Sequence, residues 1–255
     1  MQKLPAILAI KHALYAVVHF RNAGIRIGLF WILALTGVNI LDLMYFGNAG
    51  SAGNDPAQVM NIQPTYFMIL AFSLIVFSSI AVNWHRYILL DEVTTPEKIF
   101  RLDRPVWNYA GRTLLIMLMV LVPVLILSTA VLAASPNFSP LLAFPFFLAG
   151  IYIMRMSVAL PAVALERKDF GITAALQVTQ GNNLQFAGLL ALNALIFLAT
   201  FLVLAFILTI VGSVSATAAR ILAIALSVPA NLFLSLFSVS LLSSLYGFFV
   251  EKRKF

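Results

Sequence analysis

The sequence predicts an all-α protein whose helices cross a membrane, and three observations support this fold class. Hydrophobic residues make up 62% of the chain and charged residues only 10%, whereas soluble domains are about 45–50% apolar and about 25% charged. The apolar residues form six runs, each long enough to cross the roughly 30 Å hydrocarbon core of a bilayer as a helix. The runs are continuous and long, which excludes the alternating strands of a membrane β-barrel.

The first expected element is an N-terminal segment, residues 1–22, which we interpret as a short helix lying at the membrane surface. Six spans follow it in a polytopic transmembrane helix bundle, and we expect one membrane domain over residues 1–255. The expected spans are about 25–46, 64–84, 112–133, 141–165, 186–211 and 221–250. Short loops rich in Gly, Ser, Asn and Pro follow spans 1, 3 and 5, so the six spans form three hairpins.

The distribution of Lys and Arg predicts the orientation of the spans. Of the 16 basic residues, 14 lie in or beside one set of loops and the two terminal segments, whereas the opposite loops contain only Arg220. Basic residues are concentrated in cytoplasmic loops of membrane proteins, so both termini are expected in the cytoplasm. The net charge of +7 therefore indicates contact with anionic lipid head groups rather than with nucleic acid.

A weak threefold repeat runs through the chain. The odd-numbered spans begin with Ala-Gly, at Ala23-Gly24, Ala110-Gly111 and Ala187-Gly188. The even-numbered spans end with a glutamate, at Glu92, Glu166 and Glu251. A short cytoplasmic helix at the membrane surface is expected before each odd-numbered span, and Thr95-Pro96 has the residues of a helix start. The alternative is that small residues and charges mark the edges of spans in any membrane protein.

Arg155 is the costliest residue of the predicted spans, because a charge near the bilayer centre is unfavourable by at least about 2.5–3.5 kcal/mol. It lies ten residues before the end of span 4, or about 15 Å above the inner edge. The expected partners are Asp42, the acid within span 1, and Asn39 one turn before it. Two interpretations stay open: Arg155 contacts an anionic substrate in a cavity, or it fixes the packing of the helices.

The stretch AVNWHRYILLDE marks the expected inner end of span 2. Trp84 and Tyr87 suit the head-group belt, where aromatic residues are enriched, and Arg86 suits the phosphates below it. His85 completes a set of four residues that we expect to anchor the span or to contact lipid head groups. A small head-group pocket at this place is the functional alternative to plain anchoring.

Residues for catalysis or for binding a metal or cofactor are scarce. The chain has no cysteine, which excludes thiol chemistry, and it has three histidines. It lacks the His-Glu-x-x-His, phosphate-loop and Gly-x-Ser-x-Gly patterns. We therefore expect no catalytic residues, no metal, no cofactor and no enzymatic activity.

Residues 161–188 resemble a pattern of bacterial polytopic membrane proteins. The pattern combines Pro161-Ala162 at the end of a span, an Ala-rich short helix at Ala174-Ala175, Thr179-Gln180-Gly181, and a new span from Ala187-Gly188 onward. It is similar to that of the YciC-like and the glycerophosphodiester-phosphodiesterase membrane-domain-like families. AVNWHRYILLDE also resembles a stretch in membrane proteins of alphaproteobacteria. The resemblance implies a six-helix protein of the bacterial inner membrane and no particular activity.

Two functions remain as expectations. The first is a non-enzymatic accessory, assembly or scaffold subunit of the inner membrane that acts by helix packing. The second is a transporter or lipid-handling protein in which Arg155 contacts an anionic substrate. The expected partners are membrane lipids, through anionic head groups on the cytoplasmic face, together with other membrane proteins or a second copy of the chain.

Overall fold

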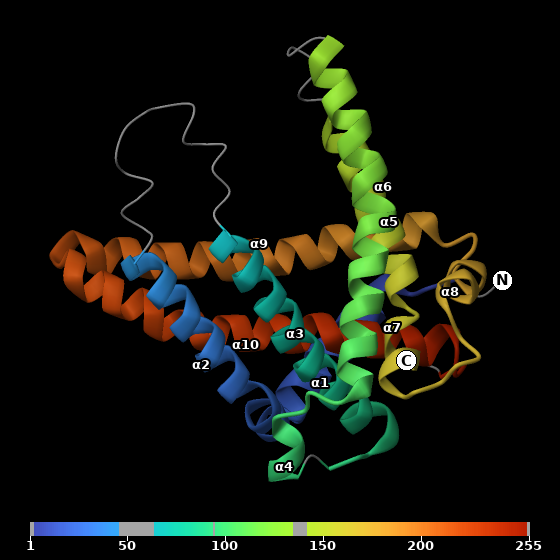
Figure 1. The fold of residues 1–255 in the computed structure, drawn as a ribbon, viewed down its shortest axis with the longest axis horizontal. Helices are drawn as coiled ribbons and strands as arrows, with labels where there is room; N and C mark the ends of the chain where they lie inside the picture. Colours follow the sequence, from blue (N-terminus) through green and yellow to red (C-terminus); the bar gives the residue numbers. More distant parts are fainter. Residues whose placement is uncertain (1–2, 46–63, 94, 135–141, 254–255) are drawn as a thin grey trace.

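The computed structural model describes residues 3–45, 64–93, 95–134 and 142–253, and every regular element in these ranges is a helix (Figure 1). The predicted all-α fold is thereby confirmed. The helices are α1 (Ala6–His19), α2 (Arg21–Tyr45), α3 (Pro64–Leu90), α4 (Pro96–Ile99), α5 (Arg104–Ala134), α6 (Ala143–Ser157), α7 (Leu160–Ala164), α8 (Ile172–Val178), α9 (Asn183–Val214) and α10 (Ala216–Phe249).

Among the described residues, six helical stretches are long and apolar enough to cross a membrane, which agrees with the six expected spans. They are Arg21–Leu41, Tyr66–Leu90, Arg104–Ala133, Ala143–Ala164, Asn183–Val214 and Ala216–Phe249. The two largest differences from the expected boundaries occur where helical backbone continues past the apolar run. Helix α5 begins at Arg104 rather than near residue 112, and α3 continues through Trp84 to Leu90.

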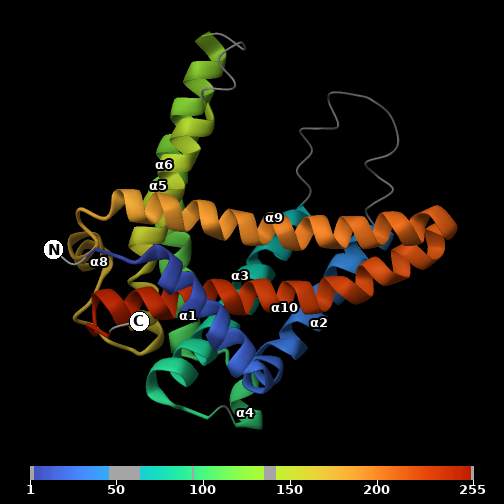
Figure 2. The ribbon, with the colours of Figure 1, turned by 180° about the vertical axis from the view of Figure 1, so that it is seen from behind.

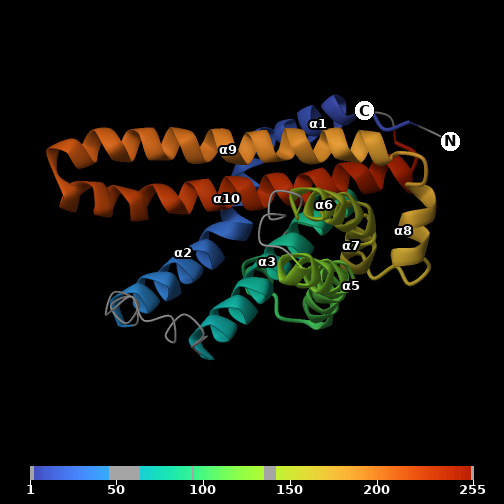
Figure 3. The same cartoon turned by 90° about the horizontal axis from the view of Figure 1, so that it is seen from above.

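The spans form three hairpins: α2 with α3, α5 with α6 and α7, and α9 with α10. A short helix precedes each hairpin, namely α1, α4 and α8, as the repeat in the sequence predicts. The three hairpins meet at one end, which we call the base, and extend from it in different directions. The α5–α6 pair runs crosswise to the α9–α10 pair (Figures 1 and 3). Their outer halves therefore do not form one common bundle.

The buried core lies in the base, where the helices of different hairpins meet. The second halves of α3 and α10 contribute half of the largest fully buried side chains, with Trp84, Phe237 and Tyr246 among them. Helix α1 lies across α10 (Figure 2). Its buried residues Ala9, Ala13 and Ala16 recur at helical spacing and form the side turned to the core. The expected surface helix in residues 1–22 is thus a packed part of the base on one side.

Each hairpin ends in the same backbone conformation. Asp91, Glu166 and Lys252 follow the three returning spans and have positive φ angles of 54°, 59° and 58°. A left-handed residue commonly ends a helix because it turns the chain away from the axis. The predicted similarity of the three span endings is therefore visible in the backbone.

A glycine pair that the span pattern does not reveal brings α2 against α10. Gly24 and Gly28 form the spacing Gly-x-x-x-Gly, which lets two helices approach closely. A Cβ atom at Gly24 would lie 2.5 Å from Leu236 Cδ1, and one at Gly28 would collide with Leu232 Cδ1. The α2–α3 hairpin is therefore seated on α10 through these two positions.

Candidate functional site

The guanidinium of Arg155 is buried at the base and bound by uncharged groups. It donates from Nε to Thr179 Oγ1 at 3.0 Å, from Nη1 to Asn183 Oδ1 at 2.8 Å and from Nη2 to the Leu176 carbonyl at 2.9 Å. These acceptors belong to the end of α8, the turn after it and the first residue of α9. The chain after α7 folds back to Arg155, so the segment from α8 to the start of α9 supplies all three hydrogen-bond acceptors of the guanidinium.

Of the two expected partners of Arg155, the structure places only Asn39, and it lies elsewhere. Asn39 is exposed on α2, and its Nδ2 donates to the Leu35 carbonyl of the same helix at 2.8 Å. The Asp42 side chain lies outside the described residues. Helix α6 packs on α5, α8 and α9. Arg155 is therefore held by the turn between α8 and α9. This turn contains Thr179-Gln180-Gly181, which belongs to the pattern that resembles bacterial polytopic membrane proteins.

Trp84 and His85, which were expected among the lipid head groups, are fully buried in the base. Trp84 Nε1 donates to Ser240 Oγ at 2.8 Å. His85 Nδ1 lies 2.8 Å from Ser243 Oγ, and its Nε2 lies 3.3 Å from Tyr109 Oη. A head-group contact in this stretch would have to come from Arg86 and Tyr87, which are only partly buried.

The serines of α10 accept hydrogen bonds from two neighbouring helices. Ser243 Oγ donates to the Val239 carbonyl at 3.1 Å, and Ser244 Oγ donates to the Ser240 carbonyl at 2.9 Å. Each hydroxyl then accepts from a histidine, Ser243 from His85 and Ser244 from His12 Nδ1 at 2.8 Å. The pattern assigns the ring proton to Nδ1 in both histidines. Ser240, Ser243 and Ser244 of α10 therefore lie in the buried interior of the base.

His12 lies on α1, outside the spans, and faces the end of the chain. Partial burial and the positive charge of Arg253 lower the pKa of His12 below its usual value. A neutral imidazole fits the assignment above, because only the neutral ring has one donating and one accepting nitrogen.

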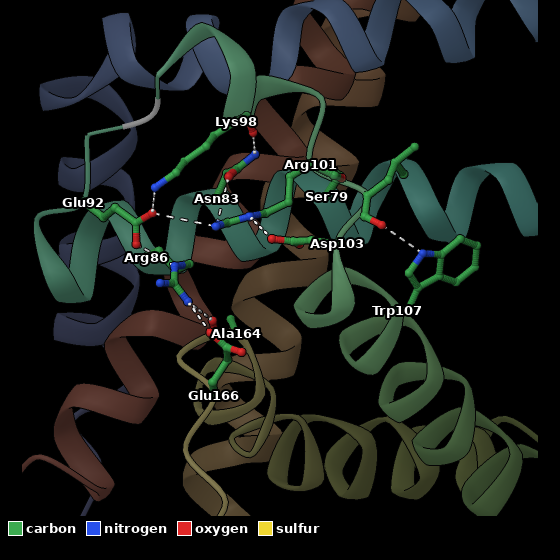
Figure 4. Close-up of polar contacts among 11 residues, drawn as sticks. Ser79, Asn83, Arg86, Glu92, Lys98, Arg101, Asp103, Trp107, Ala164 and Glu166 are labelled. Atoms are coloured by element: carbon green, nitrogen blue, oxygen red, sulfur yellow. Dashed lines mark hydrogen bonds and ion pairs between the residues drawn. The ribbon is translucent and has the colours of Figure 1, made fainter.

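A set of charged residues, which we call the charged belt, forms ion pairs at the base. Its members are Arg86, Glu92, Lys98, Arg101, Asp103, Glu166, Arg167, Glu251 and Arg253. Glu92 accepts from Arg86 Nε at 2.6 Å and from Lys98 Nζ at 2.8 Å, as Figure 4 shows. Arg101 binds Asp103 at 2.8 Å, and its backbone carbonyl accepts from Ser79 Oγ at 2.9 Å. The segment around α4 is thereby fixed against the second half of α3.

The glutamates at the ends of the returning spans connect the hairpins. Arg86 of the first hairpin reaches Glu166 at the end of the second, at 3.3 Å, and also the Ala164 carbonyl at 3.2 Å (Figure 4). Arg167 in turn reaches Glu251 at the end of the third, at 3.5 Å. The three glutamates therefore do more than mark the membrane edge, since two of them bind an arginine of the neighbouring hairpin.

Acid should weaken the charged belt at Glu92. Partial burial alone would raise the pKa of this carboxyl, but the hydrogen bonds and positive charges of Lys98 and Arg86 lower it. A carboxyl whose folded pKa is lowered adds stability above its unfolded pKa, about 4.3, and this stability is lost as the pH falls through the folded value. We expect the unfolding temperature in mild detergent to fall with pH below about 4.

The matched variants are Glu92→Gln and Asp169→Asn. Glu92→Gln should lose about 1 kcal/mol at neutral pH and show a smaller acid-dependent decrease than the wild type. Asp169 is exposed and makes no ion pair within the described residues, so its substitution should leave the curve unchanged. Equal acid dependence in Glu92→Gln and the wild type would contradict this role of Glu92.

The described residues contain no group of three or more His, Asp or Glu side chains placed to hold a metal ion. The His85–Ser243 pair is enclosed, and the serine proton is directed to a backbone carbonyl. What the arrangement provides chemically is a set of buried hydrogen bonds and ion pairs that holds three hairpins on one base.

Comparison of the chain with protein-family models, with curated protein sequences and with solved structures gives no match. The similarity to the two bacterial membrane families thus depends on the quoted residues alone. What the described structure does establish is a multi-pass membrane protein.

Proposed function

We propose that the chain is a non-enzymatic accessory, assembly or scaffold subunit that acts by packing its spans against other membrane proteins or a second copy. One observation carries this proposal: the outer parts of the hairpins expose apolar surface that the chain itself does not cover. In the most apolar stretch of α9, none of the residues is buried inside the protein. Phe201 and Phe206 of this helix are 67% and 68% exposed.

The contrast between base and hairpins supports this interpretation. The base is tightly connected, since Arg155, the serines of α10 and the charged belt all find partners within the chain. Helices α5 and α9 also pack on other helices of the base, but their outer parts expose apolar side chains such as Leu125 and Phe206. A rigid base with divergent apolar hairpins suits a protein that holds other membrane components in place.

A substrate site at Arg155 receives less support. All three guanidinium nitrogen positions donate to groups of the chain itself, and the residue is 7% exposed. An anionic substrate would have to displace the turn after α8. The enclosed His85–Ser243 pair also differs from an activated nucleophile, in which the serine proton is given to the histidine.

For location we propose the cytoplasmic membrane of a bacterium, with the base on the cytoplasmic side. The two ends of the described chain lie close together at the base (Figure 3). The charged belt and most other basic residues lie there too, as is typical of the cytoplasmic face of membrane proteins.

Photo-crosslinking in cells tests the proposed packing. A photoreactive amino acid is placed at each position from 195 to 206 of α9, which includes Leu198, Phe201 and Phe206. Packing against a protein should give discrete protein adducts at positions three or four residues apart, because one helix face meets the partner. The adducts are resolved by gel electrophoresis and identified by mass spectrometry.

Leu189, which is fully buried at the base, is the control position, and it should give no adduct with another protein. If no position of α9 gives a protein adduct, or if all give the same weak adducts, lipid covers this helix and the scaffold proposal fails.

A further inference from the structure

We propose that a cavity beside the start of α5 binds the phosphate of an anionic phospholipid such as phosphatidylglycerol. The cavity has a volume of about 690 Å³, within the usual range for small-molecule sites. The first three turns of α5 form one wall, and the segment between α7 and α8 forms the other. It is separate from Arg155 and independent of the packing function proposed above.

The charge of the cavity favours an anion. Four cations line it, Arg104, Arg112, Arg167 and Lys168, against a single carboxylate, Glu166. Glu166 is engaged by Arg86 at 3.3 Å, and Arg167 by Glu251 at 3.5 Å. Arg104, Arg112 and Lys168 form no ion pair or side-chain hydrogen bond within the described ranges. Three basic side chains around one hollow thus have their charge available for a ligand.

The position of these cations indicates a lipid. Arg104 and Arg112 lie about 12 Å apart along α5, which is the start of the third span. Trp107 lies between them, 54% exposed, with Nε1 held by the Leu102 carbonyl at 3.0 Å (Figure 4). An exposed tryptophan near the start of a span is typical of the head-group belt.

An apolar surface for the acyl chains continues from the cavity along the same helix. Leu114, Leu115 and Leu118 are 49%, 44% and 51% exposed, and Leu115 itself lines the cavity. A soluble phosphate would use only the cations, whereas a phospholipid would use both the cations and this leucine surface. The combination of charge, belt tryptophan and apolar continuation is why we favour a phospholipid over a free anion.

Two glycines keep the cavity open. A Cβ atom at Gly111 or Gly171 would meet no atom within 4 Å, and both residues line the cavity. A larger side chain at Gly111 could therefore enter the hollow without clashing with the base. This gives a variant that removes space and leaves every charge in place.

Fluorescence of Trp107 tests the proposal with the full chain reconstituted in phosphatidylcholine bilayers. Brominated phosphatidylglycerol is added in increasing amounts, and brominated phosphatidylcholine serves as the neutral lipid. Trp31 and Trp84 are buried, so subtraction of the Trp107→Phe signal isolates the quenching at the cavity. We expect phosphatidylglycerol to quench Trp107 at a lower mole fraction than phosphatidylcholine.

Matched double variants separate this site from general surface charge. Arg112→Gln with Lys168→Gln should weaken the response to phosphatidylglycerol about thirty-fold. Lys11→Gln with Arg26→Gln removes the same charge from exposed positions outside the cavity and should leave the response unchanged. Gly111→Leu keeps all charges and should also weaken it, which covers the case that the first double variant fails to fold.

Three outcomes would overturn the proposal. Equal weakening in both double variants would show diffuse attraction of the surface. Equal quenching by the two lipids would show that the cavity does not select an anion. Complete relief of quenching by glycerol 3-phosphate, together with a loss of the preference for phosphatidylglycerol, would identify a soluble phosphate as the ligand.

Discussion

Arg155→Met should lower the free energy of unfolding by about 2–3 kcal/mol and reduce accumulation of the protein in the membrane. Methionine fills similar space but has no donor. The variant removes the hydrogen bonds to Thr179, Asn183 and the Leu176 carbonyl, and bonds from a charged donor contribute about 1.5–3 kcal/mol each. Relief from burying a charge offsets part of this loss, so the total stays below the sum.

Arg155→Lys distinguishes the geometry of the guanidinium from its charge. A lysine keeps the charge but presents its donors at one point, whereas the three acceptors come from two helices and a turn. We expect Arg155→Lys to recover only about half of the lost stability. The measurement is thermal unfolding of the purified full chain in mild detergent.

Arg26→Met is the matched control, because Arg26 lies near the start of a span but is exposed and makes no ion pair within the described chain. It should unfold close to the wild-type temperature. If Arg155→Met also unfolds at that temperature, the turn between α8 and α9 does not depend on this residue and the structural interpretation is wrong.

The case of Arg155 shows what the sequence can and cannot predict. The apolar neighbours of Arg155 predict that its charge is buried in a span, and a buried charge needs partners. An acid was expected because a charge is usually paired with an opposite charge. In the structure the partners are two neutral side chains and a backbone carbonyl from α8, the turn after it and the start of α9. Neutral polar residues are too common in a sequence for such partners to be identified from it.

The number and approximate positions of the spans were predictable because apolar runs of this length are typical of membrane helices and rare in soluble domains. The directions of the hairpins were not, since a helix such as α9 is apolar on all sides and no face of it indicates a partner. Trp84 and His85 illustrate a related difficulty. Their position near the end of an apolar run suggested the head-group belt, but α3 continues to Leu90 and carries them into the core.

The seating of α2 on α10 leads to the second large effect. We expect Gly28→Leu to lower the free energy of unfolding by about 2–3 kcal/mol, since added carbons in a packed contact force neighbours to move. A Cβ atom at this position already collides with Leu232 Cδ1. Gly28→Ala should be much milder, because the colliding atom is the end of a flexible side chain.

Gly37 provides the control on the same helix, because a Cβ atom there meets nothing within 4 Å. Gly37→Leu adds the same side chain, and it should leave both unfolding temperature and accumulation near the wild-type values. Equal effects at the two glycines would mean that leucine acts through helix propensity or lipid contact rather than through α10.

A cysteine probe reports where the disturbance occurs. The chain has no cysteine of its own, so Leu236→Cys, one turn from the colliding Leu232, gives a single labelling site on α10 at a position that is 3% exposed. Maleimide should label it slowly in an otherwise wild-type chain and faster when Gly28→Leu pushes the helices apart. Rapid labelling without the glycine substitution would show that α2 does not cover α10, and the seating of α2 on α10 would be wrong.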